Sequence, residues 1–130
     1  MVMDESILAT IKKMLGLDAD YTPFDQDIIV LINSTFMTLN QLNVGPKEGF
    51  SITGYSEKWS DFVGETTQIQ LHGVQEYVYM KVRMVFDPPG NSFVMEALKQ
   101  QCEELAWRMN VQTESVEDFP WVNKENNPHL

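Results

Sequence analysis

The sequence predicts an all-α protein, a small bundle of about four helices with an ordered loop region in the middle and an extended C-terminal tail. Four segments carry apolar residues at helical spacing, glycines gather in residues 45–65, and a polar stretch follows Val111. With 130 residues, the chain is long enough for one domain with one modest core. We therefore expect a helical domain over residues 1–111 and an extended arm over residues 112–130.

The first two helices are predicted by their end signals. A helix over about residues 4–15 places Lys12 and Lys13 in its last turn, where the helix dipole favours cations, and Gly16 supplies a left-handed stop. A second helix over about residues 22–43 is expected to begin with Thr22 as the capping hydroxyl, followed by Pro23 and Asp25 in the first turn.

The third helix is expected over about residues 69–86, although its β-branched residues leave a strand open for residues 74–86. One apolar stripe runs from Leu71 through Val78 to Val85, and a second contains Tyr77, Met80 and Met84. A helix that is apolar on two faces is buried on two sides. The two prolines after Asp87 end this helix.

The fourth helix is expected from Asn91 or Ser92 to about Asn110. Its main apolar stripe contains Val94, Leu98, Cys102, Leu105 and Met109. Phe93 and Trp107 project from roughly the opposite side of the same helix. Beyond it, the tail carries one aromatic cluster within a polar, acidic sequence, made of Phe119, Pro120, Trp121 and Val122.

Composition and motifs argue against several classes of function. The net charge of −10 disfavours a nucleic-acid-binding surface, and no 18-residue apolar run is present for a membrane span. A single cysteine, Cys102, excludes an internal disulfide and fits a reducing compartment. Because Cys102 lies on an apolar stripe and His72 near a helix start, we expect no catalytic residues.

The acidic residues around position 20 do not complete a calcium loop, since Pro23 stands where the loop requires glycine. Asp18, Asp20, Asp25 and Asp27 are interpreted as caps and dipole partners of the second helix. We therefore expect no metal site, and no other cofactor.

Three apolar features exceed what one small bundle needs to bury, and together they indicate a partner surface. We expect subunit contacts at Tyr77, Met80, Met84, Phe93 and Trp107. The aromatic middle segment could instead cover these residues within one molecule. The third feature is the cluster Phe119–Pro120–Trp121–Val122, an aromatic anchor in a docking arm; a disordered terminus is the alternative.

Several segments resemble the head–tail connector (adaptor, head-completion) proteins of long-tailed phages. The most specific is residues 77–89, YVYMKVRMVFDPP, followed at the family's distance by residues 92–98 and 104–110. Residues 15–20 and 24–29 look like the opening of that family's first two helices. The similarity covers roughly residues 5–112, and Gly73 departs from a strong helix start.

The resemblance implies a structural, non-enzymatic subunit of the phage neck, assembled in the host cytoplasm and retained in the virion. It implies a homo-oligomeric ring, a dodecamer, between the portal protein and the next neck protein, a stopper or tail-completion protein. Residues 1–111 would be the helical connector domain and residues 112–130 the docking arm toward the portal. An acidic ring suits a lumen that passes DNA without binding it specifically.

A different class of function stays open from the residues alone. A small acidic phage regulatory protein that binds and sequesters a host or phage protein would share the composition of this chain. A small hydrolase has less support, because no nucleophile has a base at a suitable spacing.

Overall fold

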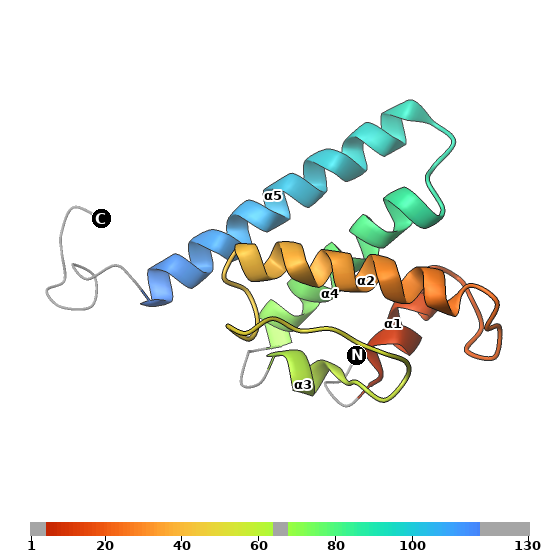
Figure 1. The fold of residues 1–130 in the computed structure, drawn as a ribbon. Helices are drawn as coiled ribbons and strands as arrows, with labels where there is room; N and C mark the ends of the chain where they lie inside the picture. The colour runs from red at the N-terminus through yellow and green to blue at the C-terminus, as the bar shows by residue number, and fades with distance from the viewer. Residues whose placement is uncertain (1–4, 64–67, 118–130) are drawn as a thin grey trace, which may run out of the picture.

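The computed structural model describes residues 5–63 and 68–117, which fold into five helices with no β-strand. The helices are α1 (Ile7–Met14), α2 (Asp25–Gln41), α3 (Trp59–Val63), α4 (Gln68–Phe86) and α5 (Ser92–Glu117), as Figure 1 shows. The predicted all-α class is confirmed, and residues 74–86 are helical rather than extended. In the described ranges, no helix combines the length and the apolar character required to cross a membrane.

Helix α1 ends as its sequence predicts. Gly16 has a φ of 86°, its N–H donates to the Lys13 carbonyl at 3.0 Å, and the Leu17 N–H donates to the Lys12 carbonyl at 2.8 Å. This pair of hydrogen bonds satisfies two carbonyls that the last turn would otherwise leave free. At the other end, the Ser6 hydroxyl caps the helix by accepting from the Ala9 N–H at 3.2 Å.

The start of α2 differs from the prediction. The helix begins at Asp25, its N-cap residue is Phe24, and no side chain caps it. The predicted role of Thr22 as the capping hydroxyl is therefore wrong; its backbone carbonyl instead accepts from the Asp25 N–H at 3.1 Å. At the other end, Asn43 takes a φ of 64° and ends the helix, as expected.

Helix α4 is the central element of the bundle. It packs against α1, α2 and α5, whereas α2 and α5 make few contacts with each other. The two apolar stripes of α4 explain this position, because a helix with neighbours on opposite sides must be apolar on both. Gly73 lies inside α4 without ending it, and a Cβ there would make an ordinary contact with a Leu105 methyl group at 3.8 Å.

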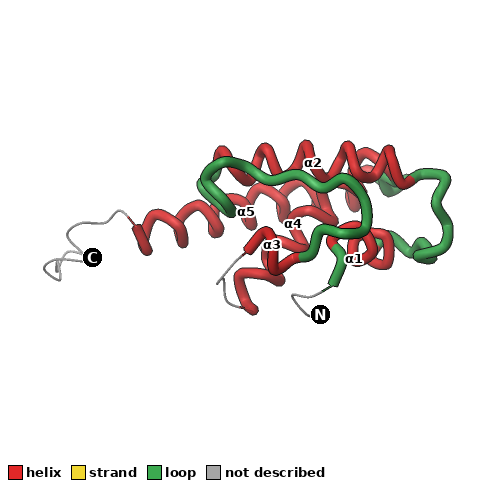
Figure 2. The backbone as a smooth tube through the Cα atoms, turned by 60° about the horizontal axis from the view of Figure 1, so that its bottom comes forward, coloured by secondary structure: helices red, strands yellow, loops and turns green. Residues whose placement is uncertain are grey.

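The middle segment forms the ordered loop that the sequence predicts. Figure 2 shows this loop running back along α2 before it enters α3. The Asn33 side chain donates to the Ile52 carbonyl at 3.0 Å and accepts from the Ile52 N–H at 2.7 Å. Trp59 is fully buried, and its indole N–H donates to the Thr10 hydroxyl at 3.0 Å. The loop is thereby fixed to both α1 and α2.

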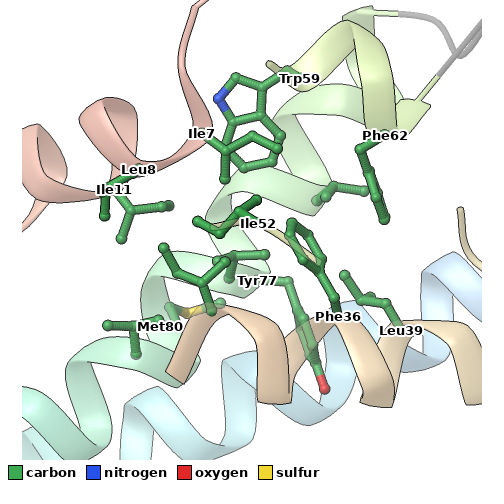
Figure 3. Packing of buried hydrophobic residues seen from close by; sticks show 14 of the residues in the cluster. Ile7, Leu8, Ile11, Phe36, Leu39, Ile52, Trp59, Phe62, Tyr77 and Met80 are labelled. Atoms are coloured by element: carbon green, nitrogen blue, oxygen red, sulfur yellow. The ribbon is translucent and has the colours of Figure 1, made fainter. Parts of the chain in front are cut away.

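The core contains apolar side chains from every helix and from the loop. Figure 3 shows part of it, with Trp59 and Phe62 of α3 beside side chains of α1, α2 and α4. The Phe36 and Phe62 rings stack at 4.7 Å between centroids, and Phe50 meets both edge-on. The aromatic residues of the middle segment are therefore used inside the molecule.

Replacing Gly45 by alanine should lower the free energy of unfolding by about 2–4 kcal/mol, because strained backbone and overpacking act together. Gly45 has a φ of 94°, and a Cβ there would lie 2.6 Å from two ring carbons of the stacked Phe62. Gly49→Ala is the matched control, since its φ is 92° but no atom lies within 4 Å. Urea unfolding of both variants measures the difference, and equal losses would contradict the predicted clash.

Candidate interaction surfaces

The groups considered for catalysis and metal binding are dispersed or buried. Cys102 is 4% exposed, and burial raises the pKa of its thiol. His72 is exposed on α4. Across residues 5–63 and 68–117, no three His, Cys, Asp or Glu side chains gather as a metal site would require. The candidate functional features of the described residues are therefore a buried polar network and exposed apolar faces.

The most buried polar group is Lys12, whose side chain is fully shielded from solvent. Its ammonium donates to the carbonyls of Tyr21 at 2.6 Å and Ala19 at 3.2 Å, and to the Tyr55 hydroxyl at 2.7 Å. It also forms an ion pair with Asp25, 2.9 Å from Oδ1, while Tyr55 donates to Oδ2 at 2.7 Å. This network joins α1, the α1–α2 loop, α2 and the middle segment.

Sequence reasoning placed Lys12 in the last turn of α1, which is confirmed, but missed its burial. The signal is present: Lys12 lies four residues after Leu8 and three before Leu15, on the apolar side of the helix. Burial opposes the charged form of both partners, yet the hydrogen bonds and charges of Tyr55 and Asp25 leave the pKa of Lys12 raised. The same network, through Lys12 and Tyr55, lowers the pKa of Asp25.

The predicted subunit contacts on α4 lie mostly within the molecule. Tyr77 is 4% exposed and Met80 is 3% exposed, and both belong to the core in Figure 3. Met84 is partly buried and packs against the same core. Because α4 has neighbours on several sides, its second stripe is already covered, and Tyr77 and Met80 retain almost no surface for another subunit.

The predicted contacts on α5 have the opposite placement. Phe93 is 85% exposed and Trp107 is 65% exposed, while Leu98, Cys102 and Met109 of the main stripe are buried. Val94 departs from that stripe and is half exposed. The middle segment covers neither Phe93 nor Trp107, so the alternative in which it buries them is wrong. Their role in subunit contacts remains a prediction.

Helix α2 carries an exposed face that sequence reasoning did not single out. Val30 is 63% exposed and Met37 is 67% exposed, two turns apart, with exposed Ser34 between them and exposed Gln41 one turn further on. The opposite side of α2 holds Ile28, Ile32, Phe36 and Leu39 in the core. The signal was available in the sequence, because Val30 and Met37 fall outside the buried stripe.

The predicted C-terminal arm begins as helix. Helix α5 continues to Glu117, beyond the expected end near Asn110, because the first helix-breaking residue is Pro120. In Figures 1 and 2 the last turns of α5 extend past the other helices. An arm extended from residue 112 is therefore wrong for residues 112–117. The cluster Phe119, Pro120, Trp121 and Val122 lies outside the described residues.

Comparison with known proteins identifies one family. The model of a family described as "Phage connector protein" matches residues 7–116, which include all five helices almost to their last residue. No curated protein and no solved structure gives a significant match to the chain.

Proposed function

The chain belongs to the phage connector protein family, and on this premise we propose that it is a ring-forming structural subunit of the phage neck. Membership indicates a component of the phage particle with a structural rather than a catalytic role. In the proposal, twelve copies form an adaptor between the portal protein and the next neck protein, a stopper or tail-completion protein. The ring assembles in the host cytoplasm and remains in the virion.

The observation that carries the proposal is the exposure of Phe93 and Trp107 on the outer side of α5. Large aromatic side chains left in water are unfavourable unless a partner covers them, and aromatic residues are enriched at the centres of protein interfaces. A subunit whose own core is complete, yet which presents two such residues on one helix, suits repeated assembly with its own kind.

Charge supports the proposed lumen. The chain carries 19 acidic and 9 basic residues, so a closed ring of copies would be strongly negative. A negative channel repels the phosphate backbone, and DNA could therefore pass without being held.

The proposed attachment to the portal rests on the C-terminal arm. Residues 118–130 follow the end of α5 and contain Phe119, Trp121 and Val122 around Pro120. Proline favours an extended backbone in the residue before it, which suits insertion into a groove or along a sheet edge. An aromatic anchor of this kind contributes about 2 kcal/mol or more to binding.

Native mass spectrometry with purified portal tests the proposal. The full chain should form a closed multi-copy assembly with portal, while a chain ending at Glu117 should remain folded and soluble but fail to join portal-bearing heads. Circular dichroism and unfolding in urea check that the truncated chain is folded. A full chain that stays monomeric with portal and instead binds a nuclease or repressor would support a sequestering regulator. A truncated chain that still completes heads would remove the arm from the mechanism.

A further inference from the structure

The outer face of α2 is unusual in a chain with this much charge. Charged residues make up 22% of the sequence, yet residues 28–42 contain none. The exposed positions of this stretch include Val30, Ser34, Met37 and Gln41, spaced as one helix face, and two of them are large apolar side chains. Interface centres are depleted in charge and enriched in methionine, whereas a solvated helix face is normally charged.

The outer face of α5 has a different character. Phe93 and Trp107 stand 14 residues apart, with exposed Gln100 midway between them on the same side. Glu96, Glu103 and Glu104 are exposed along this side, and only Glu104 has a basic partner, Arg108 at 2.9 Å. This face is therefore apolar at its ends and acidic between them. It would be repelled by most of an acidic chain's surface.

The two faces lie on different helices and point away from the core that these helices share. Helix α4 packs against both α2 and α5, and the buried side of each points toward the shared core. Their outer faces consequently point in different directions. A ring closed by head-to-tail contacts requires two unlike, complementary patches of this kind on one subunit.

We propose that the outer face of α2 in one subunit receives the outer face of α5 of the next copy. This inference rests on the proposed ring and names its two contact faces. The uncharged part of α2, residues 28–41, covers 13 helical steps, about 20 Å, and the span from Phe93 to Trp107 covers 14, about 21 Å. The α2 face carries no carboxylate from Val30 to Gln41, and the nearest one, Asp27, lies one turn before Val30, so the acidic α5 face meets no like charge along most of the contact. The small side chain of Ser34, between Val30 and Met37, leaves room for a large aromatic side chain of the neighbouring subunit.

Cysteine cross-linking on the assembled full chain tests the pairing. Ser34→Cys and Gln100→Cys place thiols midway along the two faces while leaving the four large apolar residues intact. A short bismaleimide added to portal-bound rings made from a mixture of the two single variants should give heterodimers only. The double variant should give a ladder of covalent oligomers. Native Cys102 is buried, so the wild-type chain should show no product.

The other possible cross-linking results distinguish a wrong pairing of faces from a wrong proposed function. Homodimers of Ser34→Cys alone would show α2 pairing with itself, and homodimers of Gln100→Cys alone would show the same for α5; either overturns the inference. A cross-link from Ser34→Cys to the portal would give the α2 face a different occupant and also overturn it. Rings seen by native mass spectrometry without any cross-link would overturn the pairing but leave the proposed function standing. If no multi-copy assembly forms with portal, the proposed function fails and the pairing with it. Lys58→Cys, at an exposed position just before α3, is the matched control and should give no product.

Discussion

Replacing Asp25 by alanine is expected to lower the free energy of unfolding by roughly 3–5 kcal/mol, because it leaves a buried charge without its counter-ion. The Lys12 side chain has no exposure to solvent, and Asp25 is its only anionic partner among the described residues. Removing the carboxylate also takes away the nearer of two acceptors of the Tyr55 hydroxyl, at 2.7 Å, and leaves the Ala19 carbonyl at 3.3 Å. Chemical unfolding of the variant, followed by circular dichroism, measures the loss.

Glu104→Ala is the matched control for the loss of an ion pair. Glu104 and Arg108 are paired at the same 2.9 Å, but their side chains are 61% and 68% exposed. Exposed pairs contribute about 0–1 kcal/mol, so this variant should be close to the wild type in stability. If Asp25→Ala were equally mild, Lys12 would have to reach water in solution, and the closed network would be wrong.

The network also predicts where stability depends on pH. The pKa of Asp25 is lowered from 3.8, so its contribution is complete above that value and is lost as pH falls through the lower pKa of the folded state. The pKa of Lys12 is raised from 10.5, so its contribution is complete below 10.5 and is lost as pH rises through the higher folded value. This pair should therefore contribute no pH dependence between about pH 5 and pH 9.

Local signals in the sequence were sufficient for most of the helices. The stop at Gly16, the end of α2 at Asn43 and the break after Asp87 all depend on backbone preferences of single residues, which act wherever the chain places them. The same kind of reasoning failed at Thr22, because Phe24 and Asp25 lie next to groups from other segments. Phe24 meets Phe86 edge-on at 5.4 Å, and Asp25 meets Lys12, so tertiary contacts decide where α2 begins.

The candidate surfaces were only partly predictable for a related reason. Periodicity shows which residues share a helix face, but it does not show which neighbour covers that face. Phe93 and Trp107 were correctly placed opposite the buried stripe of α5. Tyr77 and Met80 also lay on a second face, yet α4 is central and its neighbours cover that face. The uncharged face of α2 was overlooked, although Val30 and Met37 fall outside the buried stripe of that helix.

Alanine at Tyr77 and alanine at Trp107 should therefore have opposite consequences. Tyr77→Ala removes an aromatic side chain from the core, where Tyr77 is only 4% exposed. The free energy of unfolding should therefore fall by about 3–5 kcal/mol. Trp107→Ala removes a ring that is 65% exposed, so the stability of the isolated subunit should change by no more than about 0.5 kcal/mol. Urea unfolding of the two variants measures this contrast directly.

For ring assembly, in contrast to the stability of the isolated subunit, we expect Trp107 to be the critical residue. Truncation of an aromatic residue at an interface lowers the binding free energy by about 2 kcal/mol or more. In a subunit ring the same loss occurs at every contact between subunits. We therefore expect Trp107→Ala to abolish closed rings with portal. Lys13→Ala, an exposed change on α1 and outside both proposed contact faces, should leave assembly intact and serves as the control. Native mass spectrometry with portal separates the outcomes. A folded Trp107→Ala subunit that still forms closed assemblies would show that Trp107 lies outside the subunit contact. Unfolding of this variant would instead show that the Trp107 indole is buried within the monomer in solution.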